Sequence, residues 1–201
     1  MAEPTRASPF GRLAPGGAGP LTLAECRGRA LLTIGGPVAH GEFLGAVRAV
    51  LGAELPREPG GVAAARDGWT LWTGPAEWLH VSPGGDGWAL ERELLRAAGP
   101  ASGTVVDVSH GRAVLRLTGA PVRELLAGFC PIDLHPRGFP AGRCTQTLFG
   151  KMTVLLHALD DDRAGGDAFE IYVSRSFADA LAEAVLSAGH EYGCRIGGPV
   201  I

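Results

Sequence analysis

The sequence has no excess of positive charge and no long hydrophobic run. Its 201 residues contain 18 Lys+Arg against 21 Asp+Glu, for a formal net charge of −3. That balance excludes the strongly basic surface that nucleic acids and anionic membranes require, so we predict neither as a partner. No apolar stretch approaches the roughly 18 residues of a membrane-spanning helix. Arg6 and Arg12 are not followed by a hydrophobic stretch, which argues against a secretion signal and predicts a cytoplasmic location.

Paired cysteines and nucleotide-binding motifs are also missing. The cysteines Cys26, Cys130, Cys144 and Cys194 stand far apart, without a C-x-x-C pair. A zinc site or redox dithiol needs closely spaced cysteines, and a disulfide framework is typical of secreted proteins, so reduced thiols are expected. The histidines show no H-x-H or H-E-x-x-H spacing, and no Walker A or G-x-G-x-x-G motif precedes a helix. We therefore predict no metal ligand and no cofactor-binding residue in this chain.

What the sequence does contain is a globular composition, 46% hydrophobic, with periodic segments. Residues 1–20 form a Pro/Gly-rich tail without periodicity. Residues 30–34 are almost continuously apolar, as in a strand that is covered on both faces. An amphipathic helix is predicted over about 40–52 because its apolar residues recur every three to four positions. The first half then continues with strands at 69–72 and 77–81 and a helix at about 86–98.

The second half repeats this order. It is predicted to hold a strand at 113–117, a helix at 122–129, strands at 144–149, 152–159 and 169–173, and a helix at 175–188. ALLTIGGPV (30–38) matches AVLRLTGAPV (113–122), and EWLHVSP matches FEIYVSR. The sequence thus predicts an α+β fold of duplicated β-α-β-β-α units with antiparallel sheets, forming one module over 21–201 with repeats at about 21–100 and 101–196. A chance likeness to the common ferredoxin-like order is the alternative.

The densest polar cluster comes just before the central strand: Asp107, Ser109, His110 and Arg112. A catalytic triad brings together residues that are normally far apart in the chain, and no G-x-S-x-G elbow encloses Ser109. We interpret the cluster as a structural turn whose Asp and Ser satisfy backbone donors. The acidic run 160–162 lacks the spacing of a calcium loop and is predicted to be a solvated hairpin tip. No catalytic residue is predicted.

Aromatic and arginine side chains outside the predicted core faces suggest an interface. The candidates are Phe10 in the tail, the tryptophans Trp69, Trp72 and Trp78, and the loop residues His135, Arg137 and Phe139. The tryptophans could instead stack on a ring-shaped ligand or fill the core. Phe139 could likewise belong to the core of its own chain.

Three segments resemble a known family. GPAEWLHV (74–81), the run from VVDVSHGRAVLRLTG to KMTVLLHAL (105–159) and FEIYVSRSFADAL (169–181) are similar to the gamma subunits of heterotetrameric sarcosine oxidase. The resemblance extends over most of residues 20–192. More distantly, DVSHGRAVLRLTG resembles the folate-binding domain of the glycine-cleavage T protein, an aminomethyltransferase. The fold of that family, a duplicated β/α arrangement, is the one that the internal repeat predicts.

The resemblance implies a bacterial oxidoreductase complex acting on CH–NH donors in sarcosine catabolism. Such a complex demethylates sarcosine to glycine and forms hydrogen peroxide and methylenetetrahydrofolate. FAD, FMN, NAD and tetrahydrofolate are implied in its alpha and beta subunits, and zinc is implied in its delta subunit. The gamma subunit is expected to be non-catalytic and to support the alpha subunit. In the T protein an acidic pair follows at the position of 149–154, which here lacks a carboxylate. A stand-alone folate-binding or aminomethyltransferase-like enzyme and a scaffold of unknown partner are the alternatives.

Overall fold

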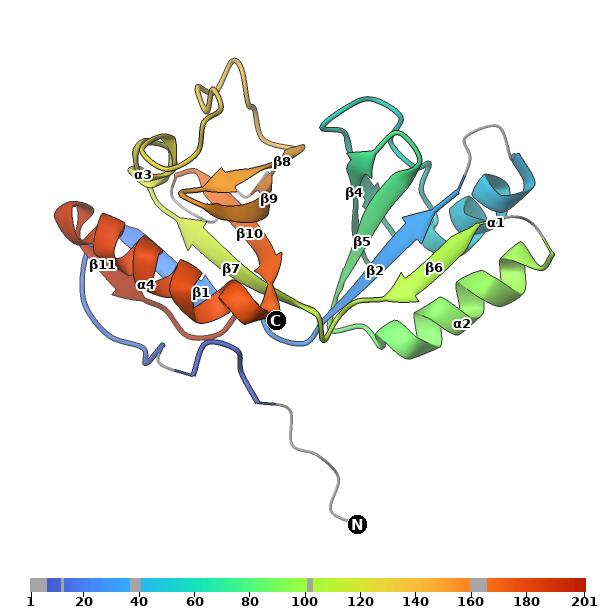
Figure 1. The fold of residues 1–201 in the computed structure, drawn as a ribbon, viewed down its shortest axis with the longest axis horizontal. Coiled ribbons are helices and arrows are strands. Elements are labelled where there is room, and N and C mark those ends of the chain that lie inside the picture. Colours follow the sequence, from blue (N-terminus) through green and yellow to red (C-terminus); the bar gives the residue numbers. More distant parts are fainter. Residues whose placement is uncertain (1–6, 12, 37–40, 101–102, 160–165) are drawn as a thin grey trace, which may run out of the picture.

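Two antiparallel sheets, each covered by helices on one face, make up the molecule. The computed structural model describes residues 7–11, 13–36, 41–100, 103–159 and 166–201. Figure 1 shows one sheet with α1 and α2 on its outer side and the other with α3 and α4. A cluster of buried side chains from both sheets fills the space between their inner faces. The layers therefore follow the order helix, sheet, sheet, helix.

The first sheet has five strands in the order β3-β4-β5-β2-β6, each antiparallel to its neighbour. The strands are β2 (Arg29–Gly35), β3 (Val62–Ala65), β4 (Gly68–Gly74), β5 (Glu77–Pro83) and β6 (Thr104–Asp107). Helices α1 (Gly41–Leu51) and α2 (Gly87–Ala98) pack on its outer face. Alternation along β2 explains this packing, since Leu32 and Ile34 face the helices and Leu31 faces the other sheet.

The second sheet has six strands in the order β11-β1-β7-β10-β9-β8. They are β1 (Leu21–Glu25), β7 (Arg112–Thr118), β8 (Arg143–Phe149), β9 (Met152–Leu159), β10 (Ala168–Ser174) and β11 (Cys194–Ile196). Among the strands of the described residues, only β11 runs parallel to its neighbour, β1. Helices α3 (Val122–Ala127) and α4 (Ala178–Gly189) cover the outer face, and two short 3₁₀ turns, Arg175–Phe177 and His190–Tyr192, flank α4.

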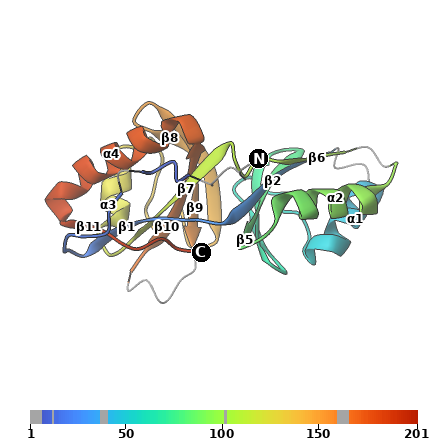
Figure 2. The same cartoon turned by 90° about the horizontal axis from the view of Figure 1, so that it is seen from below.

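The strand order of the second sheet repeats that of the first. The central strand β2 has β5 on one side and β6 on the other, and the central strand β7 has β10 and β1 in the same places. The α+β fold with duplicated units and antiparallel sheets is thus confirmed. With repeats drawn at 21–100 and 101–196, each repeat gives one strand, β1 or β6, to the other's sheet. The chain crosses between the sheets at 26–28 and 108–111, which meet near the centre of Figures 1 and 2.

Several elements differ from those that the sequence pattern predicts. The expected helix at 175–188 begins as a 3₁₀ turn and becomes α-helical only at Ala178. The strands β1, β3, β6 and β11 were not predicted. The tail is ordered from residue 13 to β1, and Gly16 forms a β-bridge with Ile196. The acidic run 160–162 lies outside the described residues. Within the described part of the chain, no helix has the length and apolarity needed to cross a membrane.

Candidate functional site

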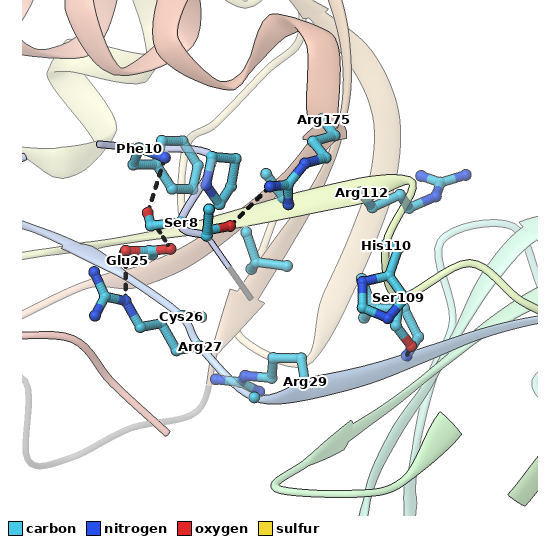
Figure 3. A pocket seen from close by; sticks show the side chains of 16 residues that line it. Ser8, Phe10, Glu25, Cys26, Arg27, Arg29, Ser109, His110, Arg112 and Arg175 are labelled. Atoms are coloured by element: carbon cyan, nitrogen blue, oxygen red, sulfur yellow. Dashed lines mark hydrogen bonds and ion pairs between the residues drawn. The ribbon is translucent and has the colours of Figure 1, made fainter. Parts of the chain in front are cut away.

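A cavity lies where the two crossovers meet. It has a volume of about 640 Å³ and is lined by the crossover residues of 26–28 and 109–110, by the N-terminal segment 7–10 and by Arg175. Figure 3 shows Arg27, Arg29 and Arg175 around it, with Glu25 beside Arg27. A pocket of this size with convergent polar groups is the natural first candidate for a binding site. What this cavity can bind depends on which of its polar groups already form hydrogen bonds or ion pairs within the chain.

The polar cluster before the central strand forms a turn on one wall of the cavity. The Asp107 carboxylate accepts a hydrogen bond from the Ser109 amide at 2.8 Å and a short one from the Ser109 hydroxyl. Ser109 Oγ in turn accepts from the amide of Leu31 in β2 at 2.9 Å. His110 is exposed and makes no hydrogen bond to Ser109 within the described part of the chain. Asp107 and Ser109 therefore tie a chain crossover to β2, and the geometry is not that of a nucleophile and its base.

The opposite wall is closed by the N-terminal segment. The Ser8 hydroxyl donates to Glu25 Oε1 at 2.7 Å, and Arg27 Nε pairs with Glu25 Oε2 at 2.7 Å. Arg175 Nη2 donates to the carbonyl of Ala7 at 2.8 Å. Phe10 anchors the segment because its ring is buried in the hydrophobic core beneath α3 and α4. The cavity thus has a wall made by residues that precede the first strand.

Beneath the cavity an ion pair joins the two sheets. Arg29 Nη2 of β2 lies 2.6 Å from Glu170 Oε1 of β10, and the two side chains are 3% and 0% exposed. Tyr172 donates its hydroxyl to the other Glu170 oxygen, Oε2. Burial, followed by the nearby Glu170 charge, raises the pKa of the Cys26 thiol to about 12. This thiol is therefore protonated at neutral pH and is a poor nucleophile.

Two aromatic contacts extend this network. The Arg29 guanidinium lies 5.8 Å from the centre of the Trp69 ring, and Trp69 meets His157 edge to face at 5.9 Å. Burial lowers the pKa of His157 to about 4, so the ring is neutral at pH 7. Trp69 is thus a partly buried bridge between the sheets.

The arginines around the cavity are engaged within the chain. Arg27 pairs with Glu25, Arg29 pairs with Glu170, and Arg175 holds a backbone carbonyl. In Figure 3 the guanidinium of Arg112 points away from the other labelled side chains, and burial lowers its pKa. Among the described residues, no three His, Cys, Asp or Glu side chains come together as a group that could hold a metal ion. The arrangement stabilises the crossing point of the chain.

Three of the aromatic residues expected outside the core lie inside it. Phe10, Trp78 and Phe139 are 2%, 1% and 7% exposed, so the expectation that they stand free of the core is wrong. Trp78 Nε1 donates to the Pro56 carbonyl at 2.7 Å, and the Phe139 ring stacks on Phe169 with centroids 6.2 Å apart. These partners are distant in sequence, so local periodicity does not reveal that the two rings are buried.

The remaining interface candidates are accessible. His135 and Arg137 are exposed in the loop after α3, and Trp72 is partly buried on β4. Trp72 and Phe139 line a second cavity of about 460 Å³ at the seam between the edge of β8 and the first sheet. The hydrogen bonds across that seam include Cys144 amide to Gly60 carbonyl at 3.0 Å and Gln146 Nε2 to Thr73 carbonyl at 2.6 Å. Sequence reasoning missed this seam because its two sides are some seventy or more positions apart.

Comparison with known proteins identifies the family. Residues 35–190 match the model of the sarcosine oxidase gamma subunit family. A sarcosine oxidase gamma subunit of Arthrobacter sp. is 43% identical over 112 residues, which are 55% of this chain and about half (54%) of that protein. The gamma subunit from Corynebacterium sp. strain P-1 is 34% identical over 148 residues, 73% of this chain and 70% of that one.

One solved structure agrees with this assignment, and a second shares the fold. A chain of the heterotetrameric sarcosine oxidase from Corynebacterium sp. U-96, solved with pyrrole 2-carboxylate, superposes with a TM-score of 0.81 at 30% identity, over 93% of this chain and 96% of that chain. The aminomethyltransferase T of the glycine cleavage system from Bartonella henselae shares the fold, with a TM-score of 0.63 at 21% identity over 90% of this chain and 48% of that one. The chain belongs to the sarcosine oxidase gamma subunit family.

Proposed function

We propose that this chain is the non-catalytic gamma subunit of a heterotetrameric, flavin-dependent sarcosine oxidase. The observation that carries the proposal is the likeness to a chain of such an enzyme along almost the whole length of both chains. Within the complex the chain supports assembly, and the alpha subunit is its most direct partner, alongside the beta and delta subunits. The complex converts sarcosine to glycine and forms hydrogen peroxide and methylenetetrahydrofolate in the cytoplasm.

A supporting role fits the chemistry of the described residues. The polar groups at the central cavity are engaged in holding the crossovers and the N-terminal segment. The position that is acidic in the T protein holds the Gly150-Lys151 turn between β8 and β9. A cationic side chain there would not stabilise a developing cation on a folate-bound amine, so independent aminomethyl transfer is disfavoured. FAD, FMN, NAD, tetrahydrofolate and zinc would then belong to the partner subunits.

The exposed loop of residues 131–143 is our candidate for contact with the alpha subunit. His135 and Arg137 stand free of the core in this loop, and arginine is enriched at interface hot spots. The backbone of the loop is already ordered, because Arg123 Nη1 donates to the carbonyls of Leu134 and Phe139 at 2.7 and 2.8 Å. An ordered loop loses less conformational entropy on binding. The N-terminal tail is proposed to lie against the same partner.

Co-purification tests the function. The chain is produced alone and together with the alpha, beta and delta subunits, and mass and visible spectra are recorded for both preparations. We expect a colourless, inactive isolated chain and a flavin-coloured complex that contains it. A yellow isolated chain, or peroxide production from sarcosine by the chain alone, would contradict the non-catalytic role. Tight binding of tetrahydrofolate by the isolated chain would favour the stand-alone folate-binding alternative.

A further inference from the structure

The two sheets differ at one equivalent edge. In the second sheet β1 lies beside the central strand β7, and β11 extends the sheet beyond β1 with Leu21 opposite Cys194 and Leu23 opposite Ile196. In the first sheet β6 occupies the place of β1 beside the central strand β2. Among the described residues, however, no strand pairs with the outer side of β6. The second sheet therefore has one more strand on this side of its central strand than the first sheet has.

The open edge presents hydrogen-bonding groups of the backbone. The Val108 amide donates to the Leu31 carbonyl at 2.8 Å. Because successive residues of an antiparallel strand alternate in direction, the N–H and C=O groups of Val106 also face β2. Those of Val105 and Asp107 then point outward, to the side on which β11 would lie in the other sheet. An extended segment placed there would find donors and acceptors at the spacing of a strand.

The four-residue edge strand lacks two of the residues that usually keep exposed edges apart. Exposed edge strands are commonly protected by lysine, proline or a bulge, and Thr104–Asp107 contains neither lysine nor proline. The Asp107 carboxylate is turned toward Ser109 by two hydrogen bonds. Val106 is 50% exposed, so an apolar side chain is available beside the free backbone groups.

Helix α2 begins next to this edge and exposes two apolar side chains. Its first residue, Gly87, lies so close to Asp107 that an added Cβ would be 2.5 Å from Oδ2. The next residue, Trp88, is 60% exposed, and Leu95, two turns further along, is 44% exposed. Arg92 covers one face of the Trp88 ring, with 4.5 Å from its guanidinium carbon to the ring centre. Exposed aromatic residues beside an open edge are typical of surfaces that bind another chain.

We propose that the outer edge of β6 binds an extended segment of another subunit of the complex, which adds a strand to the first sheet as β11 does to the second. The segment carries apolar side chains at alternate positions, so that one of them meets Val106 on the same face of the sheet. Backbone hydrogen bonds to Val105 and Asp107 hold it in place. This inference rests on the proposed function, because it requires a partner subunit.

Hydrogen exchange of the isolated chain and of the complex tests the inference. We expect the amides of Val105 and Asp107 to exchange at least about tenfold more slowly in the complex, which corresponds to ~1.4 kcal/mol of added protection. The edge strand β3, at the other side of the same sheet, serves as the internal reference and keeps its rates. Equal exchange of 103–108 in the free and assembled chain would overturn the proposal.

A matched pair of substitutions gives the second readout. Val106→Lys places a charge on the proposed docking edge, and Ala64→Lys places one at an exposed position of β3. We expect Val106→Lys to lower the yield of co-purified complex about tenfold or more, equivalent to at least ~1.4 kcal/mol of binding free energy, with little change in the melting temperature of the free chain. Ala64→Lys should assemble normally.

The possible results separate the two proposals. If the unmodified chain fails to join the complex, the proposed function is wrong. If it assembles and Val106→Lys assembles equally well, the function stands and the docking edge is wrong. A free chain that is a dimer with 103–108 already protected would identify a second copy as the occupant and would also overturn the inference.

Discussion

Arg29 and Glu170 form the ion pair that holds the two sheets in their relative position. Both side chains are almost completely buried, one on β2 and the other on β10. Removing one partner of a buried pair leaves an uncompensated charge, which costs about 3–5 kcal/mol. We therefore expect Glu170→Gln to lower the free energy of unfolding by about 3 kcal/mol. In the double variant with Arg29→Met the two losses should be far from additive.

Urea unfolding of the two single variants and the double variant measures this coupling. Arg27→Met is the control for the loss of an arginine, since Arg27 is half exposed in its pair with Glu25 and should change stability by at most about 1 kcal/mol. Additive effects of Arg29→Met and Glu170→Gln would contradict a direct interaction.

Two buried histidines make stability depend on pH. Burial lowers the pKa of His80 and of His157 to about 4 in the folded chain, below the ordinary value of 6.5. Between these values the unfolded chain binds more protons than the folded chain, so stability is lost as the pH falls from 6.5 toward 4. Each group contributes at most about 3 kcal/mol over this window.

The measurement is unfolding free energy as a function of pH. His157→Leu should flatten the curve between pH 6.5 and 4, because a group that cannot be protonated no longer differs between the two states. His110→Leu, at an exposed position, controls for the loss of a histidine side chain. If His157→Leu retained the full slope, the buried ring would not be its source.

Individual residues were predictable where the interaction is local. The spacing of Asp107 and Ser109 predicts a turn, and the structure has that turn, since the carboxylate reaches an amide only two residues away. The burial of Phe10 depends on α3, α4 and β7, which come a hundred residues later. Trp78 donates to Pro56, 22 positions earlier, and Phe139 stacks on Phe169 of β10, so local sequence does not reveal that these rings are buried.

At the level of elements, the crossover turn at 107–109 can be tested by comparing the stability of an Asp107 variant with that of a variant at an exposed turn of the same kind. Asp107→Ala leaves the Ser109 amide without its acceptor and loosens the hydroxyl that receives the Leu31 amide. We expect a loss of about 1–2 kcal/mol of stability, the cost of leaving a partly buried donor unpaired. Activity of the assembled complex should fall only in proportion to assembly.

Asp133→Ala is the matched control for this turn. Asp133 accepts from the amide of His135 at 2.8 Å in the same two-residue arrangement, but the contact is exposed to solvent. Water can replace it, so the stability loss should stay below about 0.5 kcal/mol. Normal assembly of Asp107→Ala with abolished turnover would instead give Asp107 a catalytic role.

Long periodic elements were predictable, and short or exchanged ones were not. The helices at 41–51 and 87–98 and the strands β9 and β10 follow clear apolar patterns and were predicted within a residue or two. The strand β3 reads VAAA, which carries no alternation. The strand β11 has three residues and is stabilised only by its distant partner. The strands β1 and β6 each pair with the sheet of the other repeat. This pairing joins segments far apart in the chain, so a short stretch of sequence does not reveal it.

At the level of the whole molecule, some surfaces of the duplicated fold are in contact within the chain and others remain accessible. The inner faces of the sheets and the seam at β8 are occupied by contacts within the chain, and Arg29 beneath the central cavity is paired with Glu170. The loop after α3 and the edge of β6 remain accessible. A subunit that acts through assembly must bind its partner through such accessible surfaces.

The loop holds an exposed residue and a core residue within three positions of each other. Phe139 fills the core against Phe169, so Phe139→Ala should lower the free energy of unfolding by about 3–5 kcal/mol and reduce assembly only through that loss. Arg137 is exposed, so Arg137→Ala should leave the melting temperature of the free chain unchanged and weaken co-purification with the alpha subunit. Arg96→Ala, on the exposed side of α2, controls for the loss of a surface arginine. Thermal melts and co-purification of the three variants test both roles. A stable Phe139→Ala chain that fails to assemble would make the ring an interface residue. An Arg137→Ala chain that assembles like the unmodified one would place the contact with the alpha subunit outside this loop.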